Sequence, residues 1–98
     1  MPFKGQYFSE TAAGTTSAAI TLSAGSTYYV TDVGASTSGT PGTITIKSGS
    51  TTIWEQQLSS APYEKSFVTP LRVIAGNDLV ITATGSTATY VNISGFSL

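Results

Sequence analysis

The chain of 98 residues has no cysteine and no histidine, and only 9% of its residues are charged. Without thiol or imidazole groups it has no thiolate nucleophile, no histidine general base and none of the sulfur or nitrogen ligands that zinc and copper prefer. The lack of cysteine fits both a reducing cytosol and a particle that must last outside cells without redox dependence. Composition therefore excludes most side-chain chemistry and names no reaction.

Charge of either sign is scarce, and the formal net charge is −1. Nucleic-acid binding requires several cations placed against phosphates, so we predict no nucleic-acid partner. The few carboxylates show neither the pairing of a glycosidase nor the spacing of a calcium loop, and we expect no enzymatic activity, metal or cofactor. The cations are Lys4, Lys47, Lys65 and Arg72, and the carboxylates are Glu10, Asp32, Glu55, Glu64 and Asp78.

The N-terminal residues 1–5, MPFKG, contain no basic region followed by an apolar stretch. They predict neither a signal peptide nor a membrane span, and we expect a complete short protein made in the cytoplasm. The length predicts one domain over residues 1–98, with residues 1–10 as an N-terminal arm or an edge strand. So small a core leaves a margin of only a few kcal/mol unless subunits associate, which favours a homo-oligomer.

Serine and threonine make up about a third of the chain, and apolar residues recur at every second position. This period predicts strands with one buried face, and the short connections rich in glycine, serine and threonine require antiparallel pairing. Residues 43–57 form the clearest hairpin, and residues 34–42, which lack large apolar side chains, predict a surface loop. The expected strands cover residues 5–10, 19–23, 26–33, 43–47, 51–57, 65–74 with a break at Pro70, 78–84 and 88–94.

The predicted fold is an all-β, antiparallel β-sandwich of about eight strands. A jelly-roll-like arrangement is favoured, with an immunoglobulin-like sandwich as the alternative, because periodicity does not distinguish the two topologies. The expected inward residues are Ile20, Leu22, Ile44, Ile46, Leu79, Ile81, Val91 and Ile93.

The aromatic residues are the one ambiguous set. Tyr28 and Tyr29 are adjacent, so their side chains point to opposite faces of a strand, and only one of them can enter a single core. The other can pack under a loop, lie in a subunit or particle interface, or stack on a sugar ring. The candidate interface residues are Phe3, Tyr7, Phe8, Tyr28, Tyr29, Trp54 and Tyr63.

Residues 73–96, VIAGNDLVITATGSTATYVNISGF, resemble the closing hairpin of small β-sandwich proteins of tailed bacteriophage particles. In those proteins an "AG-x-x-L" turn and strand precedes a Ser/Thr-rich turn and a last strand that ends in "v-x-v-x-G-[FY]". Residues 24–30, AGSTYYV, are similar to the "aG-x-x-y-x-l" second strand of the same proteins. The pattern contains no functional residue that could be transferred to this chain.

The resemblance implies a virion structural protein, namely a capsid decoration (cement) protein. Such a protein would be made in the host cytoplasm, act on the capsid surface as a trimer and bind the major capsid protein across several capsomers. In that role Phe3, Tyr7 and Phe8 would anchor an N-terminal arm. The alternative is a receptor- or carbohydrate-binding module of a phage tail, which predicts an exposed cluster of Trp54 with Tyr28 or Tyr63.

Overall fold

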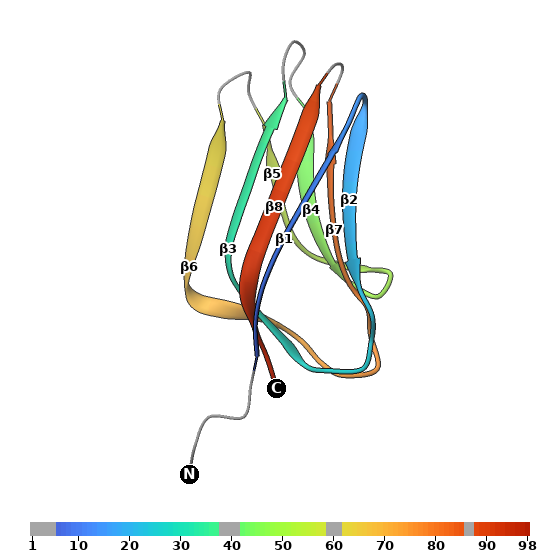
Figure 1. Ribbon diagram of the computed structural model, residues 1–98, viewed down its shortest axis with the longest axis vertical. Coiled ribbons are helices and arrows are strands. Elements are labelled where there is room, and N and C mark those ends of the chain that lie inside the picture. The colour runs from blue at the N-terminus through green and yellow to red at the C-terminus, as the bar shows by residue number, and fades with distance from the viewer. Residues whose placement is uncertain (1–5, 38–41, 59–61, 86–87) are drawn as a thin grey trace.

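The computed structural model describes residues 6–37, 42–58, 62–85 and 88–98. Over these residues the chain forms eight strands and no helix, which confirms the predicted all-β fold (Figure 1). None of the described segments is therefore a helix long and apolar enough to cross a membrane. The strands are β1 (Gln6–Gly14), β2 (Ser17–Leu22), β3 (Tyr28–Thr37), β4 (Thr43–Ser48), β5 (Thr51–Gln57), β6 (Tyr63–Val73), β7 (Leu79–Thr84) and β8 (Thr89–Ser97).

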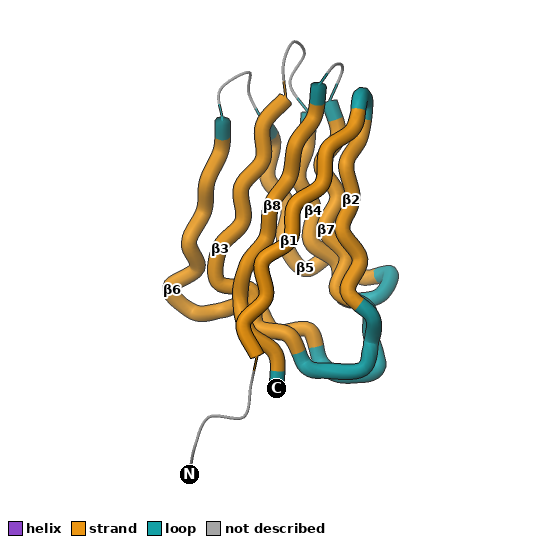
Figure 2. The backbone as a smooth tube through the Cα atoms, viewed as in Figure 1, coloured by secondary structure: helices purple, strands orange, loops and turns teal. Residues whose placement is uncertain are grey.

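The strands form two antiparallel sheets of four, in the orders β1-β8-β3-β6 and β2-β7-β4-β5. We call them the front sheet and the back sheet, as they lie in Figure 2. The pairs β1·β8, β2·β7, β3·β6 and β4·β5 show that the chain is one long hairpin rolled into a sandwich. This pairing is that of a jelly roll and excludes the immunoglobulin-like alternative, whose sheets follow a different strand order.

Consecutive strands near the C-terminus lie in different sheets. β7 pairs with β2 and β4 in the back sheet, whereas β8 pairs with β1 and β3 in the front sheet. The hairpin expected over residues 73–96 is therefore wrong, because the chain crosses between sheets after β7. Alternation predicts strands and the faces that they bury. It does not distinguish two consecutive strands that form a hairpin in one sheet from two that lie in different sheets. The β4–β5 hairpin, by contrast, is confirmed.

The core lies between the sheets and is built from aliphatic residues in cross-strand rows. On the back sheet, Ile20 is paired with Ile81, Ile81 with Ile46, and Ile46 with Trp54. β-Branched side chains pack well on such a pleated surface, and their cross-strand contacts stabilise the sheet. Leu22 packs half-buried against the core, and the other expected inward residues are confirmed as buried: Ile20, Ile44, Ile46, Leu79, Ile81, Val91 and Ile93.

The expected loop over residues 34–42 is wrong in its first part. β3 continues to Thr37, and Gly34, Ala35 and Thr37 are buried. β6 and β8 pair with this segment from both sides, so its backbone groups bond within the sheet. Its inward residues, Ala35 and Thr37, are small and only weakly apolar or polar. They therefore do not produce the alternation of large apolar and polar residues that marks a strand in the sequence. Residues 38–41 lie outside the described part.

The two edge strands of the front sheet, β1 and β6, differ from the expected strand boundaries. β1 is an edge strand that pairs with β8 along residues 6–14, so residues 6–10 belong to the sheet and residues 1–5 lie outside the described part. β6 is one strand with a register shift: Ser66 faces Asp32 and Leu71 faces Val30. The four intervening residues bend β6 near the expected break at Pro70 (Figure 1). Proline is tolerated there because β6 is an edge strand.

Candidate functional site

The outer face of the front sheet carries an aromatic row across all four strands. Tyr7 is paired with Phe96, Phe96 with Tyr29, and Tyr29 with Arg72. The rings of Tyr29 and Phe96 stack with centroids 4.9 Å apart and planes 13° apart, and Tyr7 is 82% exposed. We call these four residues the aromatic row. Tyrosine, phenylalanine and arginine are the residue types enriched in protein interfaces, so this row is a candidate contact surface.

Two other predicted residues, Phe8 and Tyr28, pack inward. Their rings meet edge to face with centroids 5.7 Å apart, and both lie half-buried against the core. The Tyr28 hydroxyl donates a hydrogen bond of 2.6 Å to the Ser23 carbonyl oxygen, which satisfies its polar end. As alternation predicts, Tyr28 and Tyr29 point to opposite faces. Phe3 lies outside the described residues.

Trp54 and Tyr63 lie together at the open side of the sandwich, where β5 ends the back sheet and β6 ends the front sheet. Their rings stack at 6.2 Å, and Trp54 also meets Phe67 edge to face at 5.4 Å. All three pack half-buried against the core, and the Lys65 Nζ atom lies 5.9 Å from the centre of the Phe67 ring. We call Trp54, Tyr63 and Phe67 the edge cluster. It joins two strands that do not hydrogen-bond to each other, so its first role is structural.

The cluster that a tail module predicted therefore forms only in part. Trp54 stacks on Tyr63, but both rings are half-buried against the core, and Tyr28 packs on Phe8 instead. A sugar platform requires a ring whose face is open to solvent, and the edge cluster does not provide a fully open one.

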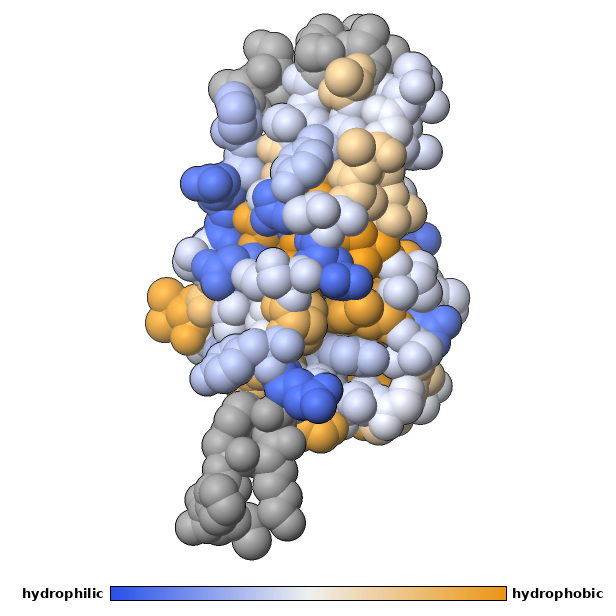
Figure 3. Space-filling view, in the orientation of Figure 1, coloured by the Kyte–Doolittle hydropathy of each residue, from blue (hydrophilic) through white to orange (hydrophobic). Residues whose placement is uncertain are grey.

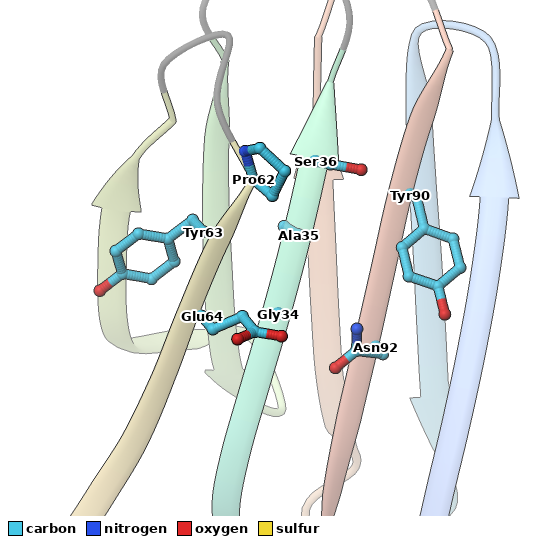
Figure 4. Close-up of a pocket in the computed structure, with 8 residues that line it drawn as sticks. All are labelled: Gly34, Ala35, Ser36, Pro62, Tyr63, Glu64, Tyr90 and Asn92. Atoms are coloured by element: carbon cyan, nitrogen blue, oxygen red, sulfur yellow. The ribbon is translucent and has the colours of Figure 1, made fainter.

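A groove over Gly34 is the second feature of the outer face. It consists of two adjoining hollows of about 150 and 170 Å³ that share Glu64 and Asn92. Cross-strand pairing places these two residues on either side of Gly34, which has no side chain to fill the space (Figure 4). The space-filling view shows hydrophilic residues gathered around the middle of this face, with hydrophobic surface between them (Figure 3).

We call the hollow lined by Ser36 and Tyr90 the upper hollow and the one lined by Asp32 and Ser66 the lower hollow. The Asp32 carboxylate in the lower hollow accepts two side-chain hydrogen bonds. The Ser66 hydroxyl donates a 2.5 Å hydrogen bond to Asp32 Oδ1, and the Thr31 hydroxyl donates one of 2.9 Å to Oδ2. These bonds, that of Ser66 first, lower the pKa of Asp32 below its usual value because they favour the charged form. Asp32 is thus an ionised hydrogen-bond acceptor at neutral pH.

Sequence reasoning missed the groove because its parts come from distant segments. Glu64 and Asn92 meet only through the pairing of β3 with β6 and β8, and Gly34 stood in a predicted loop. Among the described residues, no group of three or more acidic side chains is placed to hold a metal ion. No protein-family model, curated protein or solved structure matches the chain.

Proposed function

We propose that the chain is a capsid decoration protein of a tailed bacteriophage, which stabilises the head by binding across capsomers. The small jelly roll and the low charge support this role. The sequence resemblance of residues 73–96 also supports it, although these residues form strands of two sheets and not a hairpin. The observation that carries the proposal is the aromatic row, a contact surface of three aromatic rings with one arginine at its end. A subunit that binds only the assembled shell stabilises that shell by mass action.

The aromatic row lies at one end of an elongated molecule that measures 48 × 23 × 18 Å. Other exposed apolar residues are close to it in the chain: Val68, 103% exposed, precedes Arg72 in β6, and Leu98, 58% exposed, follows Phe96. The described C-terminus also lies at this end (Figure 1). Covering an exposed apolar side chain of this size contributes roughly 1.5–3 kcal/mol, so this end has more to gain from contact with a partner than the rest of the face.

We expect the isolated protein to be a trimer, because three individually weak footprints then act on the shell as one. Light scattering over a dilution series measures the mass directly. The expected value is three times the chain mass of 10.1 kDa at every concentration. A mass equal to one chain throughout the series would contradict a preformed trimer and leave assembly on the shell as the only route to a threefold contact.

Binding to the major capsid protein tests decoration itself. The two proteins, taken from the same genome, are co-expressed, and the assembled capsids are separated by sedimentation. Decoration predicts that the chain sediments with capsids in a fixed ratio. The alternative, a receptor- or carbohydrate-binding module of the tail, predicts that it stays with tail structures and is missing from purified heads.

A further inference from the structure

The groove over Gly34 has a composition and shape that the decoration role does not require. We propose that it binds a neutral saccharide of two sugar rings, one in each hollow. This is a second function, on the same face as the aromatic row but at a different place. Asn92 is four residues from Phe96 along β8, or about 13 Å at the rise of a strand.

Gly34 makes room for the Asn92 amide, which lies against it and forms part of the groove. A Cβ atom at this position would lie 2.8 Å from Asn92 Nδ2 and 3.0 Å from Asn92 Oδ1. Any side chain here would therefore push the amide out of its place in the lining. Gly34 does not have the positive φ that favours glycine, which among the described glycines is found only at Gly49 and Gly76. Glycine is therefore needed here because a side chain would not fit beside Asn92, and not because of the backbone conformation.

The lining matches the hydroxyl groups of a sugar. In Figure 4 the Asn92 amide points toward β3 from one side and the Glu64 carboxylate from the other, with Ser36 on β3 itself. A carboxylate accepts hydrogen bonds from two adjacent hydroxyls, while an amide and a hydroxyl both donate and accept. Each hydroxyl of a sugar also does both. In the lower hollow, the ionised Asp32 and the Ser66 hydroxyl provide further hydrogen-bonding groups for sugar hydroxyls.

Tyr90 offers an apolar surface at the rim of the upper hollow. Its side chain is 41% exposed and lines that hollow from β8, with the ring on the side of β8 away from β3 (Figure 4). A tyrosine offers a large apolar ring together with a polar hydroxyl, which suits a ligand that has both C–H and O–H groups.

Charge and size restrict the ligand. No cation lines the upper hollow among the described residues, and only Lys65 lines the lower one, beside Asp32 and Glu64. A ligand with its own negative charge would therefore meet repulsion from the two carboxylates. Each hollow is far larger than the ~10–15 Å³ that a single water needs, and the two adjoin at Glu64 and Asn92. The groove thus suits an uncharged disaccharide.

The test is an NMR titration of the full ¹⁵N-labelled chain with maltose, cellobiose, lactose and N,N′-diacetylchitobiose, with N-acetylneuraminic acid as the charged comparison. We expect saturable shifts at the amides of Gly34, Ser36 and Asn92 with at least one neutral disaccharide. Glu64→Gln, which keeps the shape, and Tyr90→Ala should each weaken binding about tenfold, the effect of one good contact. Glu55→Gln on the back sheet should leave it unchanged, and the spectrum of each variant shows whether it is folded.

Two results would overturn the proposal. One is the absence of saturable shifts around Gly34 at about 10 mM of every neutral disaccharide, tenfold above a dissociation constant of about 1 mM. The other is preferential binding of N-acetylneuraminic acid. Neither outcome bears on decoration, because capsid binding is measured separately and is expected to survive Glu64→Gln.

Discussion

Ile81→Ala is expected to lower the free energy of unfolding by about 2–5 kcal/mol, the usual range for removing a fully buried isoleucine. Ile81 is 0% exposed and lies on β7, an inner strand of the back sheet. It is paired with Ile20 on one side and Ile46 on the other. Its loss would leave a cavity in the middle of the row that spans this sheet. Native proteins have roughly 5–15 kcal/mol in all, and a core this small lies toward the low end, so the change removes a large share of the stability.

Urea unfolding followed by circular dichroism measures this effect. Each kcal/mol corresponds to about 4–8 °C in melting temperature for a domain of this length, so a thermal scan should show a fall of about 10 °C or more. Thr82→Ala is the matched control, because Thr82 is the next residue on β7 and points away from the core face. A stability of Ile81→Ala within about 0.5 kcal/mol of the original protein would contradict the position of the core.

Trp54→Ala is expected to lower the free energy of unfolding by about 2–3 kcal/mol. A fully buried tryptophan would cost about 3–5 kcal/mol, and Trp54 is half-buried. Its ring contacts Tyr63 and Phe67 of β6, and these contacts join the last strand of one sheet to the last strand of the other. Without them the open side of the sandwich would expose core residues to water.

The same variant separates two roles of Trp54 that the sequence left open. If Trp54 is structural, Trp54→Ala loses stability, while the folded fraction still binds capsids as the original protein does. Trp54→Phe should recover most of the stability, because a ring remains between Tyr63 and Phe67. Full stability of Trp54→Ala combined with lost capsid binding would instead place Trp54 in the interface.

The sequence predicts strands best where large aliphatic residues alternate with polar ones. Residues 43–57 and the inward residues of β7 and β8 are such places, and the structure confirms them. Prediction fails where the inward residues are small, as at Ala35 and Thr37, because their burial depends on neighbouring strands. Local pattern also leaves open which sheet a strand joins, since β7 and β8 read as a hairpin yet lie in different sheets.

For the candidate sites, too, the sequence predicts which face a residue lies on but not which residues of other strands lie beside it. Alternation places Tyr28 and Tyr29 on opposite faces from sequence alone, so the sequence predicts that one of them lies on the outer face. The row itself requires the register that aligns Tyr7, Phe96, Tyr29 and Arg72 across four strands. The groove depends still more on register, because its floor is a residue with no side chain. Its walls come from β6 and β8, which lie on either side of β3 in the front sheet and are separated in the chain by β7 of the back sheet.

Quantitative capsid binding by aromatic-row variants shows whether the aromatic row is the surface that holds the chain on the capsid. Capsids of the same phage that lack the chain are mixed with the original protein, with Tyr7→Ser/Tyr29→Ser, or with the matched control Tyr90→Ser on the same face, and bound protein is measured after sedimentation. We expect saturable binding by the original protein and the control, and a loss of about tenfold or more for the double variant while it remains folded. Undiminished binding by the double variant, or no binding by the original protein, would contradict this expectation.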